Sequence, residues 1–407
     1  MPEIVSVGLT LSVSPTHRRI GRVRPGRVHW HETAWGLRQI TLLPSGSGEY
    51  YARERRESVR PRILVVTVVH WPDDTRIRER LIRSLASEFD VIYAARSPGP
   101  SDEIGVDYVE LAGGRMMRNL RALRLALTTD WDICVLHDPE LVVCGMIARL
   151  VRRRPVVFDV HEDFPASAHT RAWVPGPLRG LVSLLMRGLM RVAETTLTIT
   201  LAEPGYRRLF AREHPIFPNY PDTEGYPRAG TDGDGPVVYL GDVTHERGAG
   251  VAVAACSKSQ FPLRLIGRIT TETRSRLIAA SNLGDRLTMD GLLPNKVAIE
   301  ALTEASVGLA PLRDLPNYRN SQPTKILEYL AVGLPVVASD LPGTRELVAG
   351  LDAVILVPPD DPDALAAGIA EARSPAVASI ARAQASVVRD RFRWPSDDVR
   401  DFYLSLL

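Results

Sequence analysis

The chain has 407 residues, which is too long for one ordinary hydrophobic core and suits two domains of about 150–200 residues each. Hydrophobic residues make up 45% and charged residues 24%, which excludes a mostly disordered chain, a coiled coil and a collagen. The formal net charge of +2 is too small to indicate nucleic-acid binding, so no nucleic-acid partner is expected.

Sequence features relevant to location are few. No uninterrupted apolar run reaches the about 18 residues of a transmembrane helix. The first residues make a poor signal peptide, because Glu3 and no basic residue precede a short apolar stretch. Three cysteines (Cys134, Cys144 and Cys256) form neither a metal-binding motif nor a disulfide framework. We therefore expect a reducing, cytoplasmic setting and no metal held by cysteine.

Residues 1–58 differ from the remainder in composition. They are rich in Arg, Gly, Ser and Pro, with 10 Arg and 5 acidic residues up to position 60. Their hydrophobic periodicity is weak, so they can bury little apolar surface. We expect a poorly structured N-terminal extension.

From Arg62 onward, apolar strands alternate with amphipathic helices, which predicts a doubly wound parallel sheet. The expected strands are 63–69, 89–96, 132–138, 155–162 and 196–203, with helices at about 75–86, 115–127, 139–152 and 177–195.

A Pro-, Gly- and Asp-rich linker at 217–236 precedes a second alternation. The strands expected there are 237–242, 262–267, 286–291, 305–312, 335–340 and 353–359, followed by helices at about 376–391 and 395–407. The prediction is an α/β protein of two tandem Rossmann-like domains, 59–220 and 221–385, with an interdomain cleft. Residues 386–407 are expected to be helices that pack back toward the N-terminal domain.

Polar residues follow three strands of the first predicted sheet. His70 follows the first strand, His137 and Asp138 a later one, and His161 and Glu162 the next. Ligands of open parallel sheets sit outside the carboxyl ends of the strands, so these side chains are candidates for lining the cleft. Three aspartates near them are placed to cap helix N-termini: Asp73, Asp138 and Asp163.

Several common catalytic motifs are missing from the sequence. There is no zinc-ligand spacing, no G-x-x-x-x-G-K-[ST] loop, no G-x-S-x-G elbow and no G-x-G-x-x-G after a strand. These observations argue against a P-loop NTPase, a serine hydrolase and an ordinary nicotinamide dehydrogenase.

The most informative segment is NSQPTKILEYLAVGLPVVAS, which begins at Asn320. Its proline suits the first turn of a helix, so Thr324 and Lys325 would expose backbone N–H groups to an anion, especially a phosphate. Glu328 lies one turn further along, and Gly333 is expected to end the helix. The alternative is an ordinary amphipathic helix with a surface Lys–Glu pair.

This segment resembles the donor-binding signature of glycosyltransferase family 4, retaining enzymes of the GT-B fold. Five further segments resemble motifs of one branch of that family and occur in the same order, over residues 62–407. They are HWPDDTRI, HDPEL, DVHEDFP, PNYPD and YLGDVTHERG. The resemblance implies transfer of a sugar, with retention, from a nucleoside diphosphate sugar to an acceptor hydroxyl. It also implies a role in glycan, polysaccharide or glycolipid biosynthesis.

The resemblance also implies residue roles in the donor site. Glu328 matches the glutamate that holds the donor ribose, and Asn320 falls where the family has a glutamate near the donor sugar. The amides of Thr324 and Lys325 would hold the diphosphate. Arg247 matches a family lysine, whereas Asp242 stands where the family often has an arginine.

His161 occupies the position of the family's active-site histidine. Asp73 and Arg76 match the first-strand loop where donor and acceptor meet, and all three are the catalytic candidates. His137, Asp138 and Glu162 remain further cleft candidates. Neither a metal nor a cofactor is implied, because Arg and Lys can neutralise the leaving diphosphate.

Two other functions remain open at this point. One is a nucleotide-sugar 2-epimerase of similar fold. The other is a non-catalytic nucleotide-sugar-binding protein, suggested by the residues at positions 242 and 320. For the leading function, the expected partners are a nucleotide-sugar donor and a glycan or lipid-linked acceptor.

The helix expected at 177–195 carries a polar stripe of Arg179, Ser183, Arg187 and Arg191 beside many leucines. It is either a core helix with one solvated face or a basic amphipathic helix that docks on anionic lipid. The arginines at 115, 118, 121 and 124 would extend such a patch. The second alternative predicts peripheral association with the inner face of the membrane.

Overall fold

The computed structural model describes residues 42–44, 50–52, 60–97, 106–171, 174–229 and 235–407. The chain divides into two compact units, Met1–Arg60 and Pro61–Leu407. The extension expected at residues 1–58 lies largely outside the described residues. Two short antiparallel strands are described there, β1 (Leu42–Pro44) and β2 (Tyr50–Ala52).

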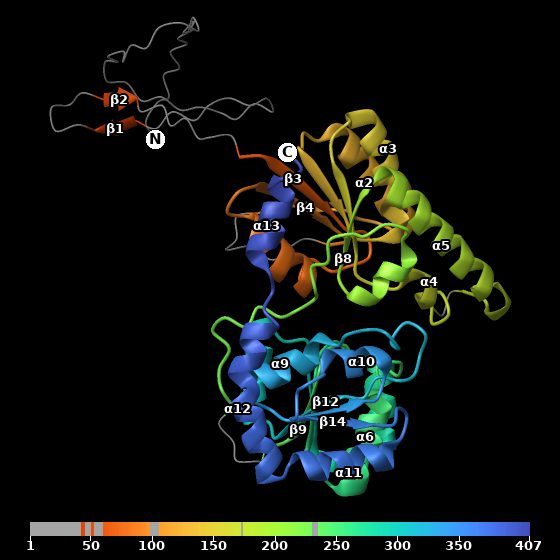
Figure 1. Ribbon diagram of the computed structural model, residues 1–407, viewed down its shortest axis with the longest axis vertical. Helices are drawn as coiled ribbons and strands as arrows, with labels where there is room; N and C mark the ends of the chain where they lie inside the picture. Colours follow the sequence, from red (N-terminus) through yellow and green to blue (C-terminus); the bar gives the residue numbers. More distant parts are fainter. Residues whose placement is uncertain (1–41, 45–49, 53–59, 98–105, 172–173, 230–234) are drawn as a thin grey trace, which may run out of the picture. The chain divides into compact units, whose positions relative to one another are not determined.

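The second unit contains two six-stranded parallel sheets (Figure 1). The first, in the N-terminal half of the unit, has the order β5-β4-β3-β6-β7-β8. Its strands are β3 (Arg62–Val66), β4 (Asp90–Ala95), β5 (Asp107–Glu110), β6 (Ile133–Leu136), β7 (Val156–Val160) and β8 (Thr198–Leu201). The central strands are buried on both faces, which is why they read as continuous Val- and Ile-rich runs.

Helices and short turns connect these strands. In chain order they are η1 (Thr75–Ile82, a π-helix), α1 (Arg83–Leu85), α2 (Arg115–Thr128), η2 (Pro139–Leu141), α3 (Val142–Arg152), α4 (Phe164–Ser167), η3 (Gly176–Leu178), α5 (Arg179–Thr196) and η4 (Pro204–Leu209). The expected strands and long helices of this half are confirmed, with ends that differ by a few residues.

The second sheet, in the C-terminal half, has the order β11-β10-β9-β12-β13-β14. Its strands are β9 (Val237–Leu240), β10 (Leu263–Ile266), β11 (Leu287–Gly291), β12 (Val307–Ala310), β13 (Val336–Ser339) and β14 (Val354–Val357). Its helices are α6 (Ala249–Ser259), α7 (Thr271–Ala280), η5 (Gly284–Arg286), α8 (Asn295–Ala301), η6 (Leu302–Glu304), α9 (Thr324–Val332), α10 (Pro342–Leu347) and α11 (Pro362–Ala372).

Both sheets have the same topology, in which the strand order reverses beside the first strand. These switch points lie between β3 and β6 in the first sheet and between β9 and β12 in the second. Diverging connections leave a crevice at such a point, at the carboxyl ends of the strands. The fold therefore places the segments after β3, β6, β9 and β12 where ligands are usually bound.

The last two helices pack on different halves of the unit. Helix α12 (Pro375–Arg391) lies along α9 (Figure 1), and its Ala381 and Val388 join the core of the C-terminal half. Helix α13 (Ser396–Leu404) contributes Val399 and Tyr403 to the core of the N-terminal half. Between them, the indole N–H of Trp394 donates to Ser84 Oγ at 2.8 Å. Among the described residues, no helix combines the length and hydropathy needed to cross a bilayer.

Candidate active site

Three histidines gather at the carboxyl edge of the first sheet. His70 follows β3, His137 follows β6 and His161 follows β7. The ring centroid of His161 lies 4.7 Å from that of His70 and 5.9 Å from that of His137. The expected convergence of the three strand ends is therefore confirmed.

Hydrogen-bond partners restrict the proton positions on the His70–His161 pair. His70 Nδ1 lies 2.9 Å from Asp74 Oδ2, and its Nε2 lies 2.9 Å from Nε2 of His161. His161 Nδ1 lies 3.2 Å from the backbone carbonyl of Asp159. Both Nδ1 atoms therefore donate, and one further proton lies between the two Nε2 atoms. Hydrogen bonding alone allows that proton on either ring, so that either His70 or His161 carries the positive charge.

The pKa shifts of the two histidines decide which ring carries the charge. Burial lowers the pKa of His70, but the hydrogen bond and charge of Asp74 outweigh it and raise that pKa to about 9. Burial, together with the positive charge of His70, lowers the pKa of His161 far below its ordinary value. At neutral pH the pair therefore carries one positive charge, on His70, and presents a neutral His161.

The aspartates near this edge differ in their roles. Asp74, not Asp73, caps η1 by accepting from the amides of Arg76 and Ile77. Asp138 caps no helix, because its Oδ2 accepts from Thr67 Oγ1 at 2.8 Å and from the Val68 amide at 2.6 Å. Asp163 caps α4, as expected. Asp138 thus fixes the loop that carries His70.

Arg76 points into the protein rather than toward the open edge. Its Nε and Nη2 donate to the two oxygens of Asp159 at 2.9 and 2.8 Å, and its Nη1 donates to the Phe217 carbonyl. His137 is also fully buried, with Nδ1 3.3 Å from Asp159 Oδ2. Both side chains lie buried beneath the edge. The catalytic role expected for Arg76 and the cleft role expected for His137 stay predictions. Asp159, His137 and His161 form a poor metal site, because Arg76 already neutralises the carboxylate.

The remaining N-terminal candidates lie nearer the surface. Arg268, which follows β10 of the C-terminal half, donates to Asp73 Oδ1 at 2.7 Å. The guanidinium of Arg268 also lies 5.3 Å from the centre of the Trp71 ring. Glu162 pairs with Arg171 at 2.7 Å. Asp73 thus links the first-strand loop to the opposite half.

Helix α9 carries the expected donor-site residues. Pro323 precedes the helix, and Gly333 ends it at φ 98°, a left-handed conformation that favours glycine. Lys325 is only 8% exposed, as is Glu328. The alternative of a surface Lys–Glu pair is therefore wrong.

Lys325 has an unusual environment. Its Nζ lies 3.8 Å from the centre of the Tyr239 ring and has no hydrogen-bond partner within the described part of the chain. Burial and the nearby charge of Arg247 lower its pKa to about 7. A buried cation without an acceptor is costly, so the site is suited to an anion.

Arg247 lies beside Lys325 on the loop after β9. The Tyr239 hydroxyl donates to the carbonyl of Asp242 at 3.0 Å and lies 3.2 Å from that of Arg247, which fixes the loop. Gly248 has a φ of +80°, and a Cβ there would lie 1.7 Å from the Pro311 carbonyl oxygen. Close packing of the loop on the segment after β12 thus requires glycine.

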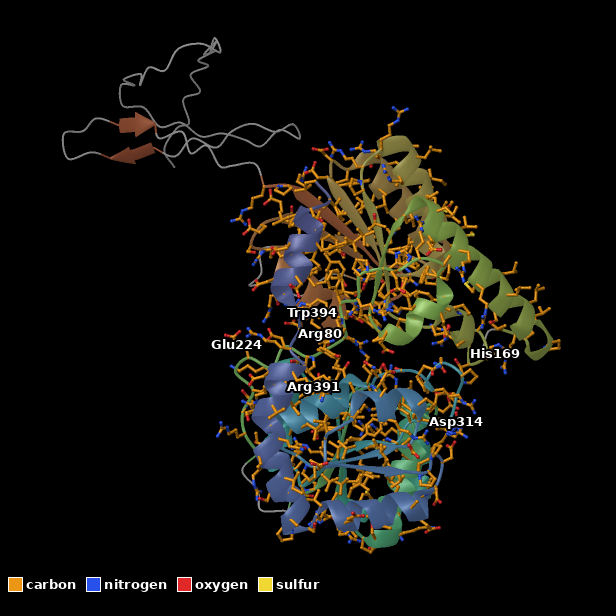
Figure 2. The ribbon with its side chains drawn as sticks, in the orientation of Figure 1. Arg80, His169, Glu224, Asp314, Arg391 and Trp394 are labelled. Carbon is orange, nitrogen blue, oxygen red and sulfur yellow. The ribbon has the colours of Figure 1, made fainter. Side chains whose placement is uncertain are left out.

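Sequence reasoning missed two residues that join the halves at α9. Arg80 of η1, labelled in Figure 2, lies with Nη2 3.9 Å from Glu328 Oε1. Its Nη1 donates to the side-chain oxygen of Asn219, whose backbone carbonyl accepts from Thr324 Oγ1 at 2.8 Å. Asn219 belongs to the PNYPD motif, but the motif does not indicate which residues Asn219 contacts. The only signal for Arg80 is its place one helical turn after Arg76.

Glu203, just after β8, was also missed. It is buried against the segment before α9, and Ser321 Oγ donates to its Oε1 at 3.4 Å. Its Oε2 has no hydrogen-bond partner in the described residues. Burial raises its pKa to about 8. Neighbouring Asn320 is exposed.

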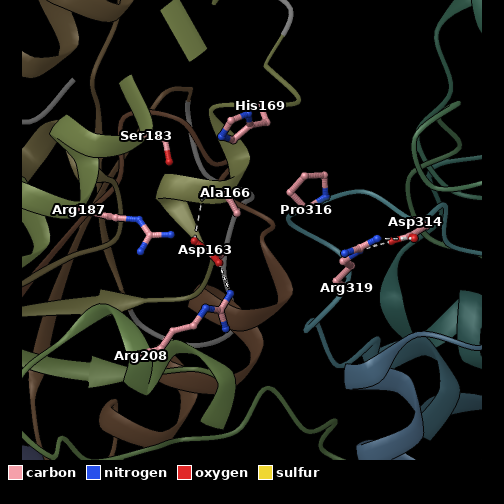
Figure 3. A pocket seen from close by; sticks show the side chains of 9 residues that line it. All are labelled: Asp163, Ala166, His169, Ser183, Arg187, Arg208, Asp314, Pro316 and Arg319. Carbon is pink, nitrogen blue, oxygen red and sulfur yellow. Dashed lines mark hydrogen bonds and ion pairs between the residues drawn. The ribbon is translucent and has the colours of Figure 1, made fainter. Parts of the chain in front are cut away.

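A cavity of about 490 Å³ lies beside these groups, lined by residues of both halves (Figure 3). The N-terminal half contributes Asp163, His169, Ser183, Arg187 and Arg208, and the loop after β12 contributes Asp314 and Arg319. Ser183 and Arg187 belong to the polar stripe of α5 that the sequence analysis considered for lipid contact.

The chain is similar in sequence to known glycosyltransferases. Residues 236–374 match the family model described as Glycosyl transferases group 1. A phosphatidyl-myo-inositol mannosyltransferase of Mycolicibacterium smegmatis is 29% identical over 281 residues, which is 65% of this chain and 68% of that protein. A putative colanic acid biosynthesis glycosyltransferase, WcaL of Salmonella typhimurium, is 34% identical over 142 residues, 33% of this chain and 35% of its own.

Solved structures show the same fold over most of the chain. A sucrose-phosphate synthase of Thermosynechococcus elongatus matches with a TM-score of 0.69 and 19% identity, covering 85% of this chain and 99% of its own. The lipopolysaccharide glycosyltransferase WaaG matches with a TM-score of 0.61 and 13% identity, covering 83% and 98%. At these identities the likeness concerns the fold, which is the GT-B arrangement of two Rossmann-like halves.

Proposed function

We propose that this chain, a glycosyltransferase of GT-B fold whose residues 236–374 belong to the group 1 glycosyl transferases, moves a sugar from a nucleoside diphosphate sugar to an acceptor hydroxyl with retention. The observation that supports the donor assignment is Lys325 at the N-terminus of α9, a buried amine that has no acceptor among the residues described by the structure. The names of the relatives, which include a phosphatidylinositol mannosyltransferase, support a role in polysaccharide or glycolipid biosynthesis.

In this proposal the C-terminal half stabilises the leaving group. Breaking the bond between sugar and diphosphate leaves negative charge on the phosphate oxygens. Lys325, Arg247 and the backbone N–H groups that begin α9 face that charge without rearranging. Glu328 would hold the ribose hydroxyls, and Asn320 would donate to or accept from the sugar. These groups supply the electrostatic stabilisation without a metal or cofactor.

The N-terminal half would contribute the face on which the acceptor approaches. The Nδ1–H of neutral His161 donates to a backbone carbonyl, and its Nε2 accepts from His70. The charge on His70 is held by Asp74. The pair would fix the transferred sugar beside the leaving phosphate, which itself takes the proton of the acceptor hydroxyl.

The experiment that tests the donor site is a thermal-shift screen of nucleoside diphosphate sugars on the wild type, Lys325→Ala and Lys296→Ala. Lys296 is exposed on α8 and serves as the matched control. A donor should stabilise the wild type and the control, because only the folded state binds it. Loss of a charge-assisted contact in Lys325→Ala should weaken binding by roughly 10–150-fold.

Transfer activity separates the functions. With the stabilising donor, Lys325→Ala should lose kcat as well as affinity, since the leaving group gains charge in the transition state. Glu328→Gln should mainly raise KM. Wild-type kcat/KM in both variants would refute the donor assignment, and donor binding without any transfer would refute an enzymatic role.

A further inference from the structure

The cavity between the halves lies next to proposed site residues of both the N-terminal and the C-terminal half. Its residue Asp163 follows His161 by two positions, and Arg319 immediately precedes Asn320. The chain after β8 also reaches this place, since a Cβ added to Gly205 would lie 3.4 Å from the Asn320 carbonyl oxygen. The diphosphate is assigned to α9 and Lys325. The cavity is therefore left for the acceptor.

The charges of the cavity are not balanced. Arg208 is paired with Asp163, and Arg319 is held by both oxygens of Asp314, at 2.5 and 2.9 Å. Each pair is internally neutral. Arg187 also lines the cavity but has no ion pair or hydrogen bond to any residue that the structure describes. Figure 3 shows its guanidinium directed toward Asp163 and Arg208. Within the described part of the chain, the exposed side chain of Arg187 is therefore a cation of the cavity without a counter-ion.

The surface next to Arg187 is apolar. On α5, Leu181, Leu184 and Leu185 are 54%, 65% and 60% exposed. Leu184 lies between Ser183 and Arg187 in sequence, so the cavity wall and the exposed leucines share one helix. A molecule with a charged group in the cavity could lay an apolar chain along α5.

From these observations we infer that the acceptor carries a phosphate group, and that Arg187 binds it in this cavity with the Ser183 hydroxyl as a second donor. A guanidinium suits this role because its planar donors match phosphate oxygens. The inference rests on the proposed transfer reaction and names the acceptor class for it. The phosphate can belong to a lipid-linked acceptor or to a soluble sugar phosphate.

The test measures calorimetric binding of octyl phosphate to the full-length wild type and to three variants. Arg187→Gln removes the proposed contact. Arg191→Gln, one turn further along α5 and outside the cavity lining, is the control for surface charge. Lys325→Ala reports phosphate that binds at the donor site instead. We expect about tenfold weaker binding in Arg187→Gln and unchanged binding in the other two variants.

The outcomes separate this inference from the donor proposal. Loss of binding in Lys325→Ala alone would overturn the cavity assignment while supporting the donor site. Equal binding in Arg187→Gln and wild type would also overturn it, as would octyl glucoside binding as well as octyl phosphate. If inorganic phosphate binds with the same Arg187 dependence, the soluble source is supported. If only octyl phosphate binds, the lipid-linked source is supported.

Discussion

At the scale of single residues, the boundary between the halves holds several ionisable groups that burial has shifted. The pKa of Lys325 is lowered and the pKa of Glu203 is raised, while Asp74 raises the pKa of His70. Such groups are costly to bury without a partner, so they tend to mark sites that bind a ligand. The motif predicted Lys325 at the start of a helix, and α9 confirms that position. The motif offered no signal for Glu203, whose burial depends on a loop more than 100 residues away.

The carboxyl of Glu203 should make stability depend on pH. Its pKa rises from an ordinary 4.5 to about 8 because of burial, so between these values the folded state holds a proton that the unfolded state releases. Stability should therefore fall as pH rises through this window. Glu203→Gln is uncharged throughout and should be more stable than wild type at pH 8.5, by up to about 4–5 kcal/mol.

Thermal melts from pH 5 to pH 9 check this expectation. The melting temperatures of wild type and Glu203→Gln should differ least near pH 5, diverge progressively up to about pH 8 and keep a constant difference above it. Glu88→Gln, which alters an exposed carboxyl, should follow the wild type at every pH. Parallel curves for wild type and Glu203→Gln would show that the carboxyl is ionised in the folded protein.

At the scale of elements, hydrophobic patterning predicted nearly all strands because most are fully buried. Within the two parallel sheets, the exception is β5, whose residues Asp107–Glu110 are only partly buried at the sheet edge and lack a continuous apolar run. The motif at α9 also located its helix, because proline and glycine mark its two ends. Contacts such as Arg76 with Asp159 could not be read, because they depend on how distant strand ends face each other.

The turn before α6 offers a test of the donor loop. Gly248 has positive φ and packs on the Pro311 carbonyl, so Gly248→Ala introduces both strain and a clash. We expect a loss of more than about 1 kcal/mol of stability, together with weaker donor binding through displacement of Arg247.

Gly250→Ala is the matched control for this variant. A Cβ at Gly250 meets nothing within 4 Å, and the residue lies two positions away, inside the helix. The Gly250→Ala substitution should leave stability unchanged or raise it slightly, since alanine has a higher helix propensity than glycine. Equal urea midpoints for the two variants would refute the packing argument.

At the scale of the whole molecule, one face of the N-terminal half exposes much apolar surface. The exposed residues on α2, α3 and α5 are Met116, Met117, Leu120, Val143, Ile147, Leu150, Val151, Leu181, Leu184, Leu185 and Val192. Arginines are interspersed among them, including Arg118, Arg149 and Arg191. The expectation of a core helix fails for α5, because only Met190, Ala193 and Glu194 are buried. Charge complementarity leads us to propose an anionic bilayer as the partner of this face.

We predict weak, salt-sensitive sedimentation with phosphatidylglycerol vesicles. Replacing the exposed Leu181, Leu184 and Leu185 with Ser should abolish it, whereas Ile278→Ser, an exposed change on α7, should not. Binding should also fall as salt rises, because surface charge attraction is screened. No sedimentation of the wild type at low salt would refute the proposal.

The two chain crossings between the halves lie together. The Trp394 amide donates to the Pro221 carbonyl at 3.2 Å, and Arg393 pairs with Glu224 at 3.1 Å, so the linker and the segment before α13 are tied to each other. The two covalent connections between the halves therefore lie side by side. Rotation about these connections would move the most distant points most. His169 and Asp314, which line the cavity, lie at the opposite end of the boundary from Glu224 and Trp394 (Figure 2). We therefore expect a small rotation of the halves to widen the mouth of this cavity and to leave the contacts of Trp394 almost unchanged.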